Sequence, residues 1–109
     1  MEKSDDENEA IVRAWASTIP EITHAYVFGS RARGDYRPES DLDIAIRLQA
    51  RGRDPSPSVT WFGEGDKWER QLQSMLPVRL DLQSLDDIET PDIKRSIEES
   101  LRLIYQRDP

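Results

Sequence analysis

The strongest constraint on the fold is a pair of short apolar segments joined by a charged turn. The first segment, 24–28, is rich in aromatic and β-branched residues and stops at Gly29-Ser30. The second, 41–48, alternates polar with apolar side chains and begins with Asp41 and Asp43 on the polar side. Because successive side chains of a strand point to opposite faces, this alternation predicts a buried face and a face that carries both carboxylates.

Hydrophobic periodicity predicts further elements around this pair of strands. Apolar residues at helical spacing predict a first helix that ends at Pro20. A second helix is predicted from Asp66, which resembles a capping box with Glu69, up to Pro77. The intervening segment 50–60 combines prolines, serines and mixed charge, and we expect a mobile loop there.

The last third of the chain predicts one more strand and one more helix. Alternation over 78–83 indicates a strand whose polar face carries Asp81. Thr90 and Pro91 suit the N-cap and first position of a final helix. Its apolar stripe would be formed by Ile93, Ile97, Leu101 and Ile104. The order of elements predicts an α/β (α+β) domain in which one small mixed sheet is backed by helices.

Length and composition limit the architecture and the classes of partner. The 109 residues suffice for a single domain, 1–109, with its own core, and we expect no separate substrate domain. The chain has no cysteine, which excludes disulfides and thiolate metal sites, and no apolar run as long as a signal peptide or membrane span. We therefore expect a cytoplasmic protein without membrane association. The formal net charge of -7 disfavours direct binding to nucleic acid.

The Gly29-Ser30 turn is a candidate phosphate-binding loop. Glycine permits close approach of the backbone to a ligand, and free amides with a serine hydroxyl suit a phosphate. Taken alone, the pattern fits a purely structural turn better, because such turns are common. Arg31 and Arg33 could pair with phosphate oxygens or lie in a solvated turn. Ser40 is a further nucleotide-binding candidate, although hydrogen bonding to its local turn is the simpler interpretation.

The aspartates are candidate metal ligands. Magnesium takes one or two carboxylates and phosphate oxygens, which Asp41 and Asp43 could supply, but the pair alone fits the solvated polar face of an edge strand better. Asp81 would join them if the strands that carry Asp43 and Asp81 are neighbours. Three converging aspartates are typical of a two-metal site for displacement at phosphorus, in which Asp81 could also serve as general base.

The spacing of these motifs resembles the nucleotidyltransferases related to polymerase beta. The Gly-Ser-Arg-Ala-Arg-Gly sequence from Gly29, followed by Asp41-x-Asp43 and by Asp81, resembles the minimal nucleotidyltransferases encoded beside HEPN-type ribonuclease toxins. The resemblance extends from His24 to Tyr105. It implies the nucleotidyltransferase fold, with Gly29 and Ser30 holding the triphosphate of ATP. It also implies that the three aspartates bind magnesium, as two ions, and form the catalytic triad.

The same resemblance implies an activity and a partner. AMP would pass from ATP to a tyrosine hydroxyl of a HEPN-type toxin, so the chain would act as its antitoxin within a hetero-oligomer. Two alternatives stay open at this stage. The chain could neutralise the toxin by binding alone, or it could adenylylate a small hydroxylated molecule such as an aminoglycoside.

Overall fold

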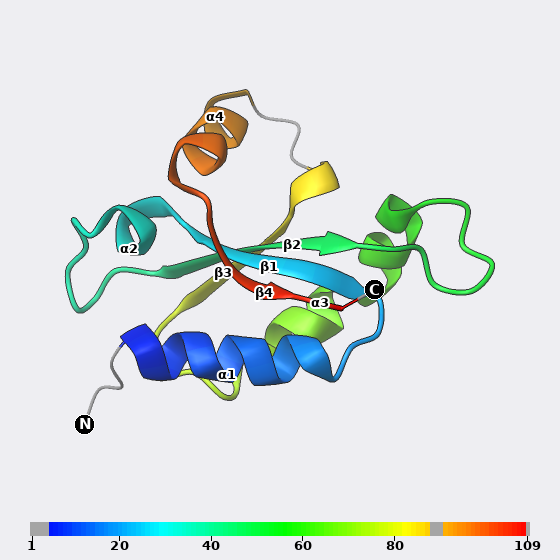
Figure 1. The fold of residues 1–109 in the computed structure, drawn as a ribbon, viewed down its shortest axis with the longest axis horizontal. Coiled ribbons are helices and arrows are strands. Elements are labelled where there is room, and N and C mark those ends of the chain that lie inside the picture. The colour runs from blue at the N-terminus through cyan, green and yellow to red at the C-terminus, as the bar shows by residue number, and fades with distance from the viewer. Residues whose placement is uncertain (1–4, 88–90, 109) are drawn as a thin grey trace.

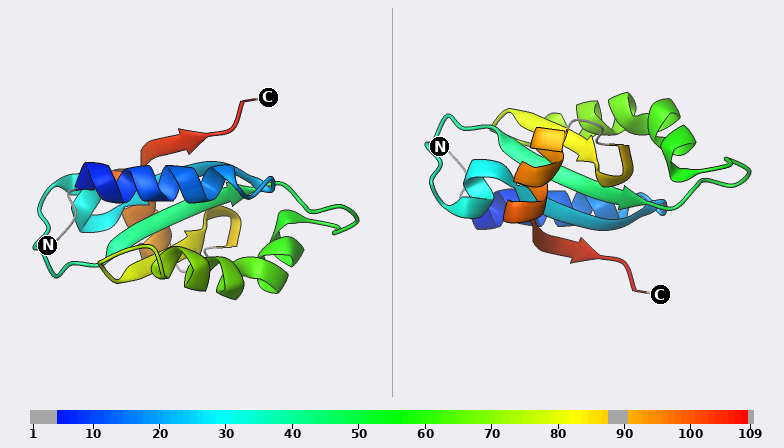
Figure 2. Two further views of the ribbon diagram at one scale, coloured as in Figure 1. Left: turned by 90° about the horizontal axis from the view of Figure 1, so that it is seen from below. Right: turned by 90° about the horizontal axis from the view of Figure 1, so that it is seen from above.

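The computed structural model describes residues 5–87 and 91–108. The order of elements is helix α1 (Asp5–Ser17), strand β1 (Ile22–Phe28), helix α2 (Gly29–Arg33), strand β2 (Leu42–Leu48), helix α3 (Pro57–Gln73), strand β3 (Leu80–Ser84), the 3-10 turn η1 (Leu85–Asp87), helix α4 (Pro91–Ser100) and strand β4 (Arg102–Gln106). The predicted α/β class is confirmed, because the strands form one mixed sheet with helices on both of its faces (Figures 1 and 2).

The sheet has the order β3-β2-β1-β4. Strand β1 runs antiparallel to both β2 and β4, whereas β2 and β3 are parallel. Figure 2 shows α1 and α3 side by side under one face of the sheet, with α4 on the opposite face. This arrangement makes β2 and β1 the central strands, so residues at the ends of these strands are enclosed by neighbours.

The main core lies between the sheet and the pair α1 and α3. Trp15 of α1 and Trp68 of α3 are buried there, as their positions on the apolar helix stripes indicate. The sheet contributes the apolar set of β2, which confirms the predicted alternation along this strand: Leu42, Ile44, Ile46 and Leu48. A second, smaller cluster lies under α4, where Phe28, Ala45 and Ile97 pack together. Each face of the central strands therefore carries a cluster of packed apolar side chains.

The structure corrects the prediction for the end of the chain. The final helix stops at Ser100, and the segment that follows is strand β4. Leu101 therefore packs on the cluster under α4, and Ile104 packs on the main core. The apolar residues Leu101 and Ile104 keep the helical spacing of α4, but hydrogen bonding to β1 makes the segment from Arg102 to Gln106 an edge strand. The expected N-cap Thr90 lies outside the described residues.

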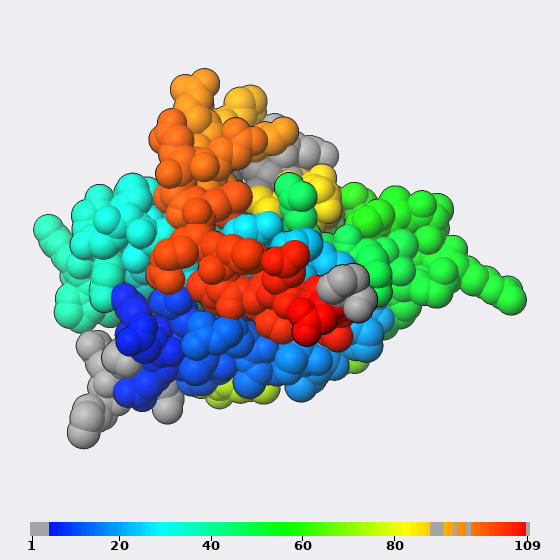
Figure 3. Space-filling model, in the orientation of Figure 1, coloured from blue at the N-terminus to red at the C-terminus, as the bar shows by residue number. Residues whose placement is uncertain are grey.

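The structure also corrects the segment 50–60. Helix α3 begins at Pro57, directly after Ser56, and not at the capping box expected at Asp66. Two glycines, Gly63 and Gly65, weaken the helical signal in the first half of this helix, and buried Gly65 packs against Trp61. The remaining loop projects beside α3 in the green part of Figure 3.

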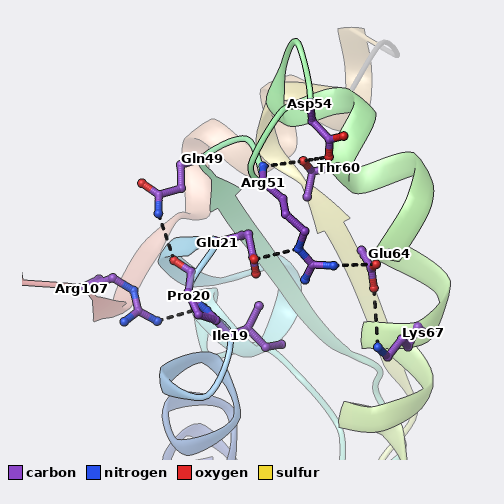
Figure 4. Close-up of polar contacts among 10 residues, drawn as sticks. All are labelled: Ile19, Pro20, Glu21, Gln49, Arg51, Asp54, Thr60, Glu64, Lys67 and Arg107. Carbon is purple, nitrogen blue, oxygen red and sulfur yellow. Dashed lines mark hydrogen bonds and ion pairs between the residues drawn. The ribbon is translucent and has the colours of Figure 1, made fainter.

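That loop is tied to the body of the protein by polar contacts. Arg51 donates hydrogen bonds to Glu21 (2.8 Å) and Glu64 (2.7 Å), which bridges the start of β1 and helix α3 (Figure 4). The hydroxyl of Thr60 donates to Asp54 at 2.6 Å and accepts from the amide of Arg51 at 2.9 Å. The prolines and serines that indicated a loop thus lead into a helix whose first turn anchors the loop.

Candidate functional site

The predicted meeting of two carboxylate-bearing strands occurs at the start of β2. In the parallel pairing of β2 and β3, Asp43 lies directly beside Asp81. On its other side, Asp43 pairs with Phe28, the last residue of β1. Both aspartates are half-buried, and they lie on the face opposite the main core. The fold therefore brings the two carboxylates to neighbouring positions at the end of β1.

Gly29 lies against Asp43 because the backbone turns sharply after β1. Its φ is +73°, a conformation that side chains rarely permit, and it begins the short helix α2. A Cβ placed on Gly29 would overlap Oδ2 of Asp43 and lie 3.1 Å from its Cγ. The glycine is thus required twice, by its backbone angle and by the carboxylate packed against it.

A pocket of about 370 Å³ opens at this point. Its lining residues come from the ends of β1, α2, β2 and β3: Phe28, Gly29, Ser30, Arg33, Asp43, Asp81 and Gln83. Five of the predicted site residues thus line one pocket, and among them the side chain of Arg33 is exposed. The arrangement combines a glycine loop, a cation and two carboxylates around a single cavity.

The carboxylates repel one another. Burial, and next to it the charges of Asp81 and Asp41, raise the pKa of Asp43 from 3.8 to about 6. Arg33 and Arg31 oppose this effect only in part. The charged form of Asp43 is therefore disfavoured in the isolated protein, and a cation at this point would relieve the repulsion.

Asp41 lies just before β2 and is exposed. Its charge reaches Asp43, as the raised pKa of Asp43 shows, but Asp41 does not line the pocket. Within residues 5–87 and 91–108, no group of three acidic or histidine side chains is close enough to hold a metal ion by itself. A metal here would need oxygen ligands from another molecule as well, which is how Mg²⁺ is usually held between carboxylates and phosphates.

Gln83 was missed by the sequence reasoning. It lies two residues after Asp81 on the same face of β3, and its side-chain amide donates a hydrogen bond to Oδ1 of Asp81 at 2.8 Å. This contact fixes the orientation of the Asp81 carboxylate. The alternation of β3 places Gln83 on the polar face, so the signal for a supporting residue was present in the sequence.

Arg31 supports the loop and does not face the pocket. Its guanidinium is buried and donates to Asp5 (2.9 Å), to the carbonyl of Pro38 (3.2 Å) and to the carbonyl of Ser40 (2.8 Å). It also lies over the ring of Tyr36. The solvated turn considered from the sequence is therefore wrong for Arg31, because its donors close the 34–41 loop onto α1.

Ser40 has a local role as well. Its hydroxyl accepts a hydrogen bond from the amide of Arg37 at 2.9 Å, within the turn that leads into β2. This is the simpler of the two interpretations that its sequence position allowed. Together, the Arg31 and Ser40 contacts hold the loop that connects the glycine turn to Asp41.

Comparison with known proteins identifies this arrangement. A family model described as polymerase beta, nucleotidyltransferase, matches residues 9–109. The chain belongs to the polymerase beta nucleotidyltransferase family. The resemblance drawn from the sequence motifs is therefore confirmed, and the pocket at Asp43 is the candidate active site of a nucleotidyltransferase.

A curated relative supports the same family. The chain is 36% identical over 75 residues, 69% of either protein, to "Putative protein adenylyltransferase MJ1379" of Methanocaldococcus jannaschii.

Solved structures share the nucleotidyltransferase fold. A crystal structure of a toxin–antitoxin pair with AMP-PNP has a TM-score of 0.67 at 23% identity, over 92% of this chain and 74% of that one. A chain of the solved complex between the tri-AMPylated Shewanella oneidensis HEPN toxin and an MNT antitoxin gives a TM-score of 0.63 at 20% identity, over 95% of this chain and 74% of that one. At these identities the likeness establishes the fold. None of the described helices of the nucleotidyltransferase is both long and apolar enough to cross a bilayer.

The two arginines of the glycine loop predict separable effects. We expect Arg31→Met to destabilise the nucleotidyltransferase by about 2 kcal/mol, because buried acceptors lose charged hydrogen bonds. Arg33→Met should change stability by less than about 0.5 kcal/mol, because its side chain is largely exposed. Urea unfolding of both variants checks this. Equal stability losses in the two variants would contradict the buried role of Arg31.

Proposed function

We propose that this nucleotidyltransferase transfers AMP from magnesium-bound ATP to a tyrosine hydroxyl of a HEPN-type toxin and thereby silences it. The observation that carries the proposal is the pairing of Asp43 with Asp81 beside Gly29 in one pocket. The adenylyltransferase name of the curated relative and the AMPylated toxin in a similar complex support AMP as the transferred group and the toxin as acceptor.

The residues of the pocket fit a magnesium–nucleotide complex better than magnesium alone. The donors are carboxylate oxygens, which Mg²⁺ prefers, and their mutual repulsion favours a cation. Because too few of them converge to hold an ion alone, phosphate oxygens would complete the coordination. Asp43, Asp81 and, from the rim, Asp41 would hold the metal ions. The metal would polarise the phosphate and stabilise the leaving group.

The chain's own residues would bind and orient the nucleotide. Gly29 and Ser30 would hold the triphosphate, and the exposed guanidinium of Arg33 would neutralise part of its charge. In the reaction, the tyrosine oxygen forms a bond to the α-phosphorus as the bond to pyrophosphate breaks. Asp81, held in place by Gln83, would accept the tyrosine proton as general base.

The experiment that tests this proposal uses the protein with the HEPN-type protein encoded beside it. Both are incubated with Mg-ATP, and the intact mass of each chain is recorded. We expect a gain of one or more AMP units on the partner, none without magnesium, and none with Asp41→Asn. Because Asp41 is exposed, this variant should fold and still bind the partner.

The outcomes separate the alternatives. A stable complex that neutralises the toxin without any mass gain would establish an antitoxin that acts by binding alone. Modification of a small hydroxylated molecule in the absence of the partner would establish the antibiotic-type transferase. The expected cytoplasmic location is part of the same proposal, since a HEPN-type ribonuclease partner would act there.

A further inference from the structure

A contact between two distant segments fixes the glycine loop. The backbone amide of Gly29 donates a hydrogen bond to Oγ of Ser100, with a nitrogen–oxygen distance of 2.9 Å. Ser100 is the last residue of α4, 71 positions along the chain. The proposed function assigns the Gly29-Ser30 loop to the triphosphate. Because the single hydrogen of the Gly29 amide is donated to Ser100, Ser100 bears on nucleotide binding through the orientation of that loop.

The register of the sheet delivers Ser100 to this position. In the antiparallel pairing of β1 with β4, Val27 lies opposite Arg102. Gly29 lies two residues after Val27, and Ser100 lies two residues before Arg102. The side chain of Ser100 therefore makes the next contact between the two segments, just beyond the ends of both strands. The guanidinium of Arg102 forms a bidentate ion pair with Glu9 of α1, which holds the start of β4 against that helix.

Helix α4 is itself packed where it can hold the loop. Its Ile97 is buried against Phe28, which precedes Gly29, and against Ala45, which lies two residues after Asp43 on the same face of β2. Figure 1 shows α4 rising from the sheet near α2, and the two helices are in contact. Ser100 is therefore carried by a packed helix end that is followed at once by a paired strand.

We propose that Ser100 is a positioning residue for the phosphate loop, an inference that rests on the proposed function. Because glycine adopts many backbone conformations with similar ease, its own preference does not hold φ at +73°. Contacts with other residues must therefore fix the backbone at Gly29. Asp43 bounds the Cα side of Gly29, and the hydroxyl of Ser100 bounds its amide side. Between them, the two contacts fix the direction of the loop amides before the nucleotide arrives.

The test compares Ser100→Ala and Ser100→Thr with Ser74→Ala as matched control. Ser74 caps the end of α3, its hydroxyl donates to the carbonyl of Gln71, and it does not line the pocket. Calorimetry with Mg-ATP should show about fivefold weaker binding for Ser100→Ala, the effect of one neutral hydrogen bond. At saturating ATP, AMP transfer should stay within about twofold of the wild type, because the reacting groups are untouched. The threonine variant, which keeps the hydroxyl, should bind as the wild type does.

Two results would overturn the inference. Unchanged affinity in Ser100→Ala would show that the hydroxyl does not position the amide. Tighter binding would show that the hydroxyl competes with phosphate for it. The calorimetric comparison needs no acceptor, so it stands even if the partner experiment shows no transfer. Failure of the proposed function would instead appear as a wild-type protein that modifies nothing.

Discussion

Asp43→Asn is expected to abolish AMP transfer while it makes the protein more stable. As a proposed metal ligand at the centre of the pocket, Asp43 should contribute several kcal/mol to catalysis, so the rate should fall by at least about a thousandfold. Stability should move the other way. The pKa of Asp43 is raised to about 6 by burial and by the charges of Asp81 and Asp41, so its ionised form opposes folding.

The sign and the pH range of the stability effect follow from that pKa. A raised pKa means that the folded protein holds its proton more tightly, so wild-type stability falls as pH rises from about 4 to about 6. Since Asp43 is only half-buried, we discount the full shift to about 1 kcal/mol at pH 7. Urea unfolding without metal or nucleotide should show Asp43→Asn more stable at pH 7 and equal to the wild type below pH 4.

The control for this prediction is Asp66→Asn, the same chemical change at an exposed position of α3. It should leave transfer intact and show no such pH-dependent gain. If Asp43→Asn were less stable than the wild type at pH 7, the carboxylate would be a structural support, and the strained site inferred from its pKa would be wrong.

Gly29→Ala is expected to damage both folding and activity. The substitution forces a side chain into the left-handed region and places its Cβ on the Asp43 carboxylate. Strain and overlap together should cost about 3 kcal/mol of stability. Transfer should fall more than about a hundredfold, because relief of the overlap moves Asp43 out of its position beside Asp81.

Gly34→Ala separates the two causes. Gly34 also has a positive φ, +87°, where it ends α2, but an added Cβ would meet no atom within 4 Å. It should therefore show only the backbone strain, about 1 kcal/mol, with transfer largely kept. Thermal unfolding and transfer assays of the pair measure the difference. Equal losses in both variants would mean that the packing of Gly29 on Asp43 is unimportant.

The local patterns of the sequence were sufficient for the centre of the molecule. Alternation from Leu42 to Leu48 predicted both the buried face of β2 and the carboxylate face, because a strand has a period of two. The same period placed Asp81 correctly on β3. Gly29-Ser30 marked the end of β1 because apolar β-branched residues stop there.

Local patterns failed where a distant partner decides the structure. The residues of β4 continue the helical stripe of α4, and only hydrogen bonding to β1 makes them a strand. The guanidinium of Arg31 became a buried anchor only because α1 brings Asp5 to it. No feature near Ser100 in the sequence indicates a contact with Gly29.

The sequence by itself thus determined which side chains share a face and which turn ends in glycine, since these follow from the period of a strand and the freedom of one backbone angle. The tertiary structure decided that Asp43 and Asp81 are neighbours, that Gly29 is packed between Asp43 and Ser100, and that Arg33 faces the pocket while Arg31 does not. The physical reason is that strand order and register depend on how the whole core packs. Local sequence patterns therefore supply the candidate site residues of this nucleotidyltransferase, but the pairing of the strands brings them together in one pocket.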